Sequence, residues 1–139
     1  MHIKSDLVKL YPGAVRLFEE LKTAKIRIGL GTNGSRASVE KLTAKLGIKR
    51  YFESIVTFED APHPKPSPDI FLQNAQNMKC LPGECIVVED STEGLSAAIA
   101  AGMKVIALST TLKKKELKHA DMILKTINDI NLSVIHWLA

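Results

Sequence analysis

Polar residues that could bind and polarise a phosphate group follow short apolar stretches of this 139-residue chain. Thr32 and Asn33 come after one such stretch, Glu89 and Asp90 come after another, and Lys65 lies between them among prolines. A hydroxyl with neighbouring backbone amides can donate to phosphate oxygens, and a lysine offers a positive charge for phosphoryl transfer. Paired carboxylates are hard oxygen ligands suited to Mg2+. Together these residue types predict a site for a phosphate ester and a magnesium ion.

Each of these features also has an ordinary structural explanation. The Thr-Asn-Gly-Ser run at 32–35 is typical of a turn or a helix cap, and Lys65 alone resembles a surface lysine. Adjacent acids at the end of an apolar strand repel each other, so they need a reason to be there. The shared position of all three groups after strands of one repeating series favours the functional interpretation.

Hydrophobic periodicity and turn residues predict alternating helices and strands. One helix is expected to have Ser67 as its N-cap and Pro68 as its first residue, with a buried stripe of Phe71, Ala75 and Met78. The other helices are expected at about Pro12–Ala24, Arg36–Leu46, Thr92–Ala101, Lys113–His119 and Ile127–Leu138. Strands are expected at Ile26–Leu30, Ser54–Thr57, Cys85–Val88 and Val105–Leu108, with an edge strand at Met122–Leu124.

This order of elements predicts an α/β fold, in which repeated strand-helix-strand units form a Rossmann-like parallel sheet with helices on both faces. A single domain over residues 1–139 is expected, because the length suits one hydrophobic core. In such folds ligands bind at the carboxyl ends of the strands. That rule places the candidate phosphate and metal residues at one edge of the sheet.

Composition limits the classes of partner. The chain is 45% apolar, has no stretch long enough to cross a membrane and shows no signal peptide, so a cytoplasmic protein without a membrane partner is expected. Cys80 and Cys85 lack a second pair of ligands at zinc spacing and are expected to be reduced structural thiols. The net charge of +4 is concentrated in the basic segment 113–119, which lacks interleaved aromatics. A solvated helix face is therefore favoured there over a nucleic-acid contact.

Three motifs carry a resemblance to a known family. They are Gly31-Thr32-Asn33, Lys65-Pro66-Ser67-Pro68-Asp69-Ile70-Phe71, and Val87-Val88-Glu89-Asp90-Ser91 with Gly94 and Ala100-Ala101-Gly102-Met103. In this order they resemble the second, third and fourth motifs of the haloacid dehalogenase superfamily, in particular the subgroup of β-phosphoglucomutase and phosphoglycolate phosphatase. The similarity extends from about Tyr11 to Ile130.

The resemblance implies a Mg2+-dependent phosphomonoester hydrolase or phosphomutase acting on a small phosphorylated metabolite. It implies that Thr32 and Asn33 bind the transferring phosphoryl group, and that Lys65 bridges this group to the nucleophile. Lys65 and Thr32 would then be the catalytic residues of this chain. Glu89 and Asp90 would hold Mg2+, whereas Ser67 and Asp69 are expected to cap a helix.

The chain departs from the family in one decisive respect. Members attack phosphate with an aspartate of an Asp-x-Asp sequence at the end of their first strand, and no Asp-x-Asp occurs here. Before the second motif the only acids are Asp6 and the adjacent Glu19 and Glu20. Asp6 has no apolar strand before it and is not a credible substitute for the nucleophile. His63-Pro64 also replaces the glycine usual before the lysine. An incomplete core is therefore expected, without the first strand and without the cap domain.

Three hypotheses remain open from the sequence. The chain is a truncated enzyme core that is inactive alone, a non-catalytic phosphate-binding or metal-binding regulatory module, or a receiver-type signalling domain. The order of the motifs argues against the receiver, whose acid pair lies at the first strand and whose lysine comes late.

The missing strand leads to an expectation about assembly. In the family this strand lies between those corresponding to Ile26–Leu30 and Cys85–Val88. These two strands should therefore pair directly or leave apolar edges open. Open edges favour self-association or the binding of a complementing N-terminal segment.

Overall fold

The computed structural model describes residues 12–109, 115 and 117–139. Its α-helices are α1 (Ala14–Thr23), α2 (Arg36–Lys45), α3 (Asp69–Asn77), α4 (Thr92–Ala100) and α5 (Leu132–Leu138). Its strands are β1 (Gly29–Gly31), β2 (Ser54–Val56), β3 (Ile86–Glu89), β4 (Lys104–Leu108) and β5 (Met122–Leu124). Short 3-10 helices are η1 (Lys49–Tyr51), η2 (Pro82–Glu84) and η4 (Ile127–Asp129). None of the helices in these ranges is long and apolar enough for a membrane span.

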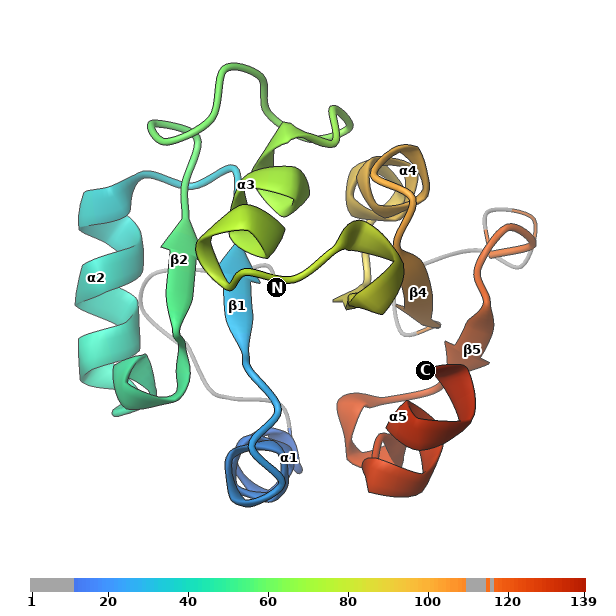
Figure 1. Ribbon diagram of the computed structural model, residues 1–139. Helices are drawn as coiled ribbons and strands as arrows, with labels where there is room; N and C mark the ends of the chain where they lie inside the picture. The colour runs from blue at the N-terminus through green and yellow to red at the C-terminus, as the bar shows by residue number, and fades with distance from the viewer. Residues whose placement is uncertain (1–11, 110–114, 116) are drawn as a thin grey trace.

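The strands form two separate parallel sheets, which confirms the predicted α/β class. β1 pairs with β2, and β4 lies between β3 and β5, with every pair parallel. Figure 1 shows β1 and β2 on one side of the molecule, next to α2, and β4 and β5 on the other side. Every predicted strand except the first begins and ends within one residue of its expected bounds.

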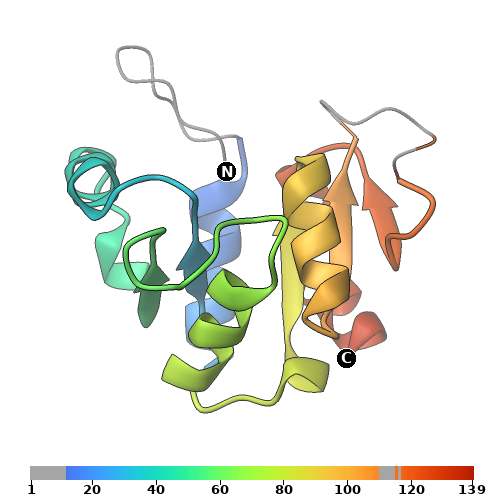
Figure 2. The same cartoon turned by 90° about the horizontal axis from the view of Figure 1, so that it is seen from above.

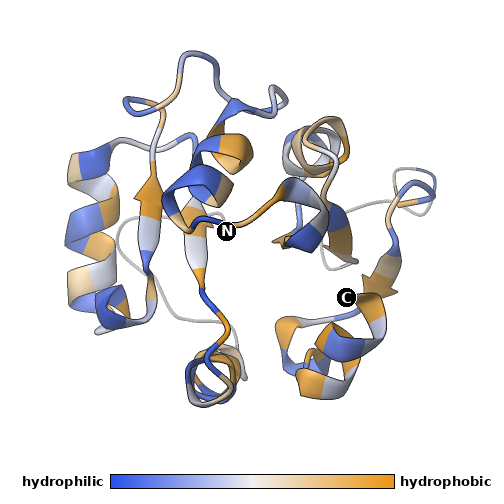
Figure 3. Cartoon of the chain, viewed as in Figure 1, coloured by the Kyte–Doolittle hydropathy of each residue, from blue (hydrophilic) through white to orange (hydrophobic). Residues whose placement is uncertain are grey.

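Alternation along β4 explains why helices cover both faces of the second sheet. Val105 packs in a cluster with residues of α3 and α4, whereas Ile106 and Leu108 pack in a cluster with residues of α1 and α5. Successive strand residues point to opposite faces, so the apolar run of β4 needs cover on both. In Figure 2, α3 and α4 lie side by side. In Figure 3, α1 and α5 carry alternate hydrophobic and hydrophilic bands, as expected of helices that bury one side.

Two serines fix the helices that follow β1 and β3. The Ser35 side chain accepts from the Ser38 N–H at 3.2 Å at the start of α2. The Ser91 side chain accepts in the same way from the Gly94 N–H at 3.0 Å at the start of α4. Each cap satisfies a helix N–H that would otherwise lack a partner. Both caps hold a loop that leaves the carboxyl end of a strand.

Three predicted boundaries were wrong. The first strand begins at Gly29 rather than Ile26. Lys25 takes a left-handed conformation (φ 59°), and the chain pairs with β2 only from Gly29 onward. Helix α3 has Pro68 rather than Ser67 at its N-cap position. The last predicted helix is divided into η4 and α5, because Asn131 leaves the helical conformation and its side chain caps α5 at the Val134 N–H. The predicted helix at 113–119 falls mostly outside the described residues.

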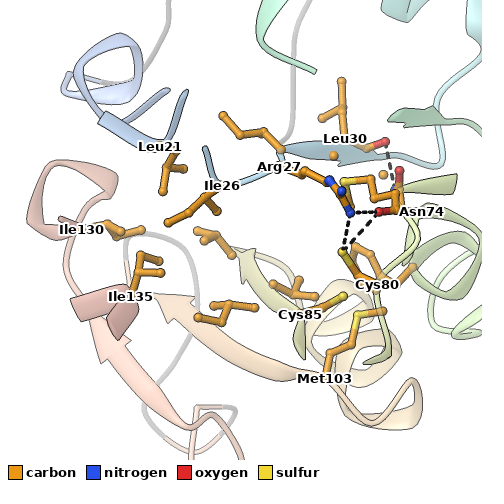
Figure 4. A pocket seen from close by; sticks show the side chains of 18 of the residues that line it. Leu21, Ile26, Arg27, Leu30, Asn74, Cys80, Cys85, Met103, Ile130 and Ile135 are labelled. Atoms are coloured by element: carbon orange, nitrogen blue, oxygen red, sulfur yellow. Dashed lines mark hydrogen bonds between the residues drawn. The ribbon is translucent and has the colours of Figure 1, made fainter. Parts of the chain in front are cut away.

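A cavity separates the two sheets. In the described part of the chain β1 and β3 do not pair, so of the two predicted alternatives, direct pairing is not found there. The cavity has a volume of about 660 Å³. Apolar side chains from β1, β3, α1 and α5 line much of it, and Figure 4 shows Leu21, Ile26, Ile130 and Ile135 around it. Arg27 and Cys80 form a more polar part of the wall.

The edge of β1 turns backbone groups toward this cavity. The Ile28 carbonyl and the Thr32 N–H both bond on the β2 side, at 2.8 and 3.1 Å. Residues of a parallel ladder bond alternately to one side and the other. Gly29 and Gly31 therefore direct their N–H and carbonyl groups away from β2, toward the cavity.

The edge of β3 is arranged in the same way. The Cys85 carbonyl accepts from the Lys104 N–H at 3.2 Å, so Cys85 faces β4. By the same alternation Ile86 and Val88 direct their backbone groups to the cavity. Two strand edges with hydrogen-bonding groups thus face each other across an apolar space.

Candidate phosphate and metal site

Lys65 is the centre of the site. Its Nζ donates to Glu89 Oε2 at 2.6 Å and to the Gly31 carbonyl at 3.0 Å, and it lies 4.8 Å from the centre of the Phe71 ring. Only 8% of the Lys65 side chain is exposed. The lysine joins the end of β1 to the end of β3. The alternative of a solvated surface lysine is thereby excluded.

Glu89 is almost completely enclosed, with 3% of its side chain exposed. Its Oε1 accepts from the Ser91 hydroxyl and from the Asp90 N–H, each at 3.2 Å, while Oε2 faces Lys65. The pKa of Glu89 is lowered from its usual value: burial raises it, whereas the Lys65 charge and the hydrogen bonds from Lys65 and Ser91 are among the causes that lower it. The result is a buried ion pair with each carboxylate oxygen bonded.

The loop after β1 holds the segment that carries Lys65. The Asn33 side chain accepts from the Lys65 N–H at 2.9 Å and donates to the Lys65 carbonyl at 3.3 Å. Thr32 Oγ1 accepts from the Gly34 N–H at 3.0 Å, which leaves the hydroxyl proton to donate elsewhere. The Asn33 side chain therefore fixes Lys65, and Thr32 is the side chain of this loop suited to donate to a phosphate oxygen.

Asp90 follows Glu89 at the carboxyl end of β3 and lines the cavity. In the described residues no group of three His, Cys, Asp or Glu side chains is arranged to hold a metal ion. The donor set of Glu89 and Asp90 still suits Mg2+, which commonly uses one or two protein carboxylates and keeps several waters. Both oxygens of Glu89 also have protein partners, in Lys65, Ser91 and the Asp90 N–H.

Gly94 allows the first turn of α4 to approach Glu89. A Cβ at Gly94 would lie 2.0 Å from the Glu89 carboxyl carbon, far inside contact distance. In most helices Gly→Ala stabilises by up to about 1 kcal/mol. Here we expect Gly94→Ala to lower the free energy of unfolding by roughly 2 kcal/mol, because the buried carboxylate must move.

Urea unfolding of this variant measures the effect, with Gly83→Ala as the matched control. A Cβ at Gly83 meets nothing within 4 Å, so little change is expected there. A Gly94→Ala protein more stable than the parent would contradict the close approach of α4 to Glu89.

Four of the predicted site residues form one connected group, and Asp90 adjoins it. Lys65 bonds to Glu89 and Asn33, and Thr32 is next to Asn33 in the same loop. Ser67 and Asp69 lie outside this group. The Ser67 hydroxyl accepts from the Asp69 N–H at 3.5 Å, and Asp69 Oδ2 is 2.9 Å from His63 Nδ1. The His63 hydrogen bond lowers the pKa of Asp69.

Sequence reasoning missed the residues that support this group. Ser91 was expected only as part of a motif, yet its hydroxyl bonds Glu89. The Gly31 carbonyl and the Phe71 ring, which surround the Lys65 ammonium, were not expected at all in that role. A serine two residues after a buried acid, at a helix start, was the signal available for Ser91.

A buried lysine and carboxylates at the carboxyl ends of parallel strands define a class of α/β protein built to bind an anionic group beside a cation. The family model for haloacid dehalogenase-like hydrolase matches residues 2–102. The chain belongs to this family.

Characterised relatives agree with this assignment. The bifunctional riboflavin kinase/FMN phosphatase of Arabidopsis thaliana is 41% identical over 129 residues, which make up 91% of this chain and 34% of that protein. The β-phosphoglucomutase of Bacillus subtilis is 32% identical over 127 residues, 91% of this chain and 54% of that protein.

A solved structure shows the same fold. A haloacid dehalogenase hydrolase of family IA, variant 3, from Entamoeba histolytica superimposes with a TM-score of 0.86 at 29% identity, over 98% of this chain and 63% of that one. The chain thus spans between 34 and 63% of the length of these three proteins.

Proposed function

We propose that this chain is the phosphate-binding and metal-binding part of a Mg2+-dependent phosphomonoester hydrolase or phosphomutase. The observation that carries the proposal is the buried Lys65 between Glu89 and the Gly31 carbonyl, at the carboxyl ends of two facing strands. A fixed ammonium at this edge is suited to stabilise the charge that develops on a transferring phosphoryl group. Membership of the family supports the same chemistry.

Each side chain has a separate part in this proposal. The Thr32 hydroxyl donates to a phosphate oxygen, and the backbone of the Asn33 loop approaches the same group. Lys65 bears the positive charge nearest the phosphate, and the Asn33 side chain holds the Lys65 backbone in place. Glu89 orients the Lys65 ammonium through the ion pair at 2.6 Å.

Mg2+ is the cofactor of the proposal, held by Asp90 and Glu89. When bound, the ion neutralises charge on the phosphate oxygens. The chain's own contribution is to present hard oxygen ligands beside a lysine. Glu89 and Asp90 offer the carboxylates for the ion, and Glu89 also bonds Lys65 and Ser91.

The nucleophile in this proposal comes from a segment outside the 139 residues. The cavity of about 660 Å³ between the two strand edges, with its largely apolar lining, is suited to a further strand covered on both faces. Such a segment, apolar on both faces, would bond to Gly29 and Gly31 on one side and to Ile86 and Val88 on the other. An acid at its carboxyl end would lie beside Lys65.

A small phosphorylated metabolite is the proposed substrate, because relatives include an FMN phosphatase and a β-phosphoglucomutase. We place the protein in the cytoplasm, where the two free thiols of Cys80 and Cys85 would stay reduced.

One observation favours a second function: without an Asp-x-Asp sequence, these 139 residues alone would act as a phosphate-binding and Mg2+-binding module. That module could equally associate with a second copy through its open strand edges.

Amide NMR titration of the purified chain with inorganic phosphate and Mg2+ tests the proposed site. We expect weak binding that shifts the signals of Gly31–Ser35 and Glu89–Ser91, and Lys65→Ala should remove the phosphate effect. Lys49→Ala is the control, since Lys49 is exposed and lies in η1, before the amino end of β2. Unmoved signals in both segments would show that the residues bind neither ligand.

A further inference from the structure

An aromatic side chain stands beside the proposed phosphate site on a rigid turn. The turn begins at Thr57, which is fully buried after β2. Asp60 Oδ2 accepts from both the N–H and the hydroxyl of Thr57, at 2.8 and 2.9 Å, and also pairs with the Arg36 guanidinium. The Asp60 N–H in turn donates to the Thr57 carbonyl at 3.0 Å. Residues 57–60 are thus held by a closed set of hydrogen bonds.

This turn is joined to the loop that carries Thr32. The Phe58 N–H approaches the Gly34 carbonyl at 3.5 Å, and the Arg36 N–H donates to Glu59 Oε1 at 3.1 Å. In Figure 2 the segment that follows β2 lies against the segment that joins β1 to α2. Phe58 is therefore a direct neighbour of the loop proposed to bind phosphate.

Phe58 is 48% exposed even though its backbone is fixed. Other exposed apolar side chains, such as Leu81 and Trp137, lie at η2 and on α5, away from this loop. Single exposed apolar residues are common on proteins and need no explanation. Phe58 differs because a fixed turn carries it next to the loop proposed to bind phosphate. A ring held in this way can stack on a planar group with little loss of conformational entropy.

We infer that Phe58 is a specificity-determining residue that favours phosphate esters whose organic part is a planar, unsaturated ring. The inference rests on the proposed function, because the phosphate must be held by Thr32 and Lys65 for the ring to reach Phe58. Phosphate anchors one end of the ligand and Phe58 contacts the other. Esters of small saturated alcohols receive only the first of these interactions.

Three probes of increasing size test the inference on the purified chain with Mg2+: inorganic phosphate, methyl phosphate and phenyl phosphate. Dissociation constants come from the amide NMR shifts of Gly31–Ser35. We expect phenyl phosphate to bind about three- to tenfold more tightly than methyl phosphate, as aromatic stacking commonly provides. Phe58→Ala should remove this preference without changing the affinity for inorganic phosphate, and Phe58→Trp should retain it. Leu81→Ala, another exposed apolar position, should leave all three affinities unchanged.

The possible results separate the two proposals. Equal affinities for methyl and phenyl phosphate in the parent chain, or a preference that persists in Phe58→Ala, would overturn the role of Phe58 and leave the phosphate site standing. Failure of all three probes to bind would overturn the proposed function and the role of Phe58 with it. Because Phe58 is half exposed, the folded amide spectrum of Phe58→Ala should match that of the parent outside the turn.

Discussion

The purified 139-residue chain is expected to show no hydrolysis of a generic phosphate ester above background, even with Mg2+ in excess. Lys65 and a bound ion could stabilise charge in the transition state, yet these residues include no Asp-x-Asp sequence to attack the phosphorus atom. Loss of a nucleophile from residues that act as a unit commonly lowers the rate by about a million-fold. The measurement is release of p-nitrophenol from p-nitrophenyl phosphate.

Activity should return when an N-terminal fragment supplies the missing strand. The fragment should contain an apolar strand about as long as β3, to fit between β1 and β3, followed by Asp-x-Asp. Its control carries Asn-x-Asn, which keeps the strand but removes the nucleophile. In the active complex, Lys65→Ala or Asp90→Ala should abolish the restored rate.

Two outcomes would contradict this account. Robust Mg2+-dependent hydrolysis by the chain alone, lost in Asp90→Ala, would mean that a nucleophile within the chain was overlooked. Binding of the Asp-x-Asp fragment with all its strand bonds but no hydrolysis would instead favour the non-catalytic binding module.

The parallel sheets could be predicted because their apolar strands are separated by helices and ended by polar turns. Cys85–Val88, for example, is a continuous apolar run that requires cover on both faces, and β3 is found within one residue of that range. The boundary at Ile26 could not be predicted in the same way, because an extended residue and a strand residue have similar patterns. The end of the chain failed for a related reason: Ile127 to Leu138 is apolar at helical spacing, but the Asn131 side chain caps a new helix there.

Proximity within the site could also be predicted, since parallel strands deliver their carboxyl ends to one edge. The particular bonds could not. Asn33 and Lys65 are 32 positions apart, and nothing local indicates that an amide side chain will bond the backbone on both sides of Lys65. The pairing of Glu89 with Lys65 was likewise unexpected, because residue type, position after a strand and family resemblance all assigned the acid to the metal. The roles in phosphate and metal binding stay predictions.

Removal of the Lys65 charge should have a large effect on stability. Lys65→Met keeps most of the side-chain volume but leaves the Glu89 carboxylate enclosed and without its cation. Breaking one partner of a buried pair typically lowers the free energy of unfolding by about 3–5 kcal/mol. Lys49→Met is the matched control, because the Lys49 side chain is 58% exposed and its Nζ is 4.0 Å from Glu40 Oε1. Such an exposed ion pair contributes little to the free energy of unfolding. Urea unfolding at pH 7 should separate the two variants clearly.

A double-mutant cycle with Glu89→Gln identifies the cause. In Lys65→Met/Glu89→Gln the uncompensated buried charge is gone, so the double variant should be more stable than Lys65→Met alone.

The pH dependence of stability provides a second check. In the parent chain the pKa of Glu89 is lowered, so its contribution to stability is present above the pKa of an unfolded glutamate and is lost as pH falls through the folded value. In Lys65→Met burial is left to raise the pKa of Glu89, so the carboxyl takes up a proton more readily in the folded state than in the unfolded one. The difference in free energy of unfolding between the parent and Lys65→Met should therefore be largest at neutral pH and shrink as the solution is acidified. A Lys65→Met protein as stable as Lys49→Met at pH 7, or a deficit that grows on acidification, would show that Lys65 and Glu89 are not a buried pair in solution.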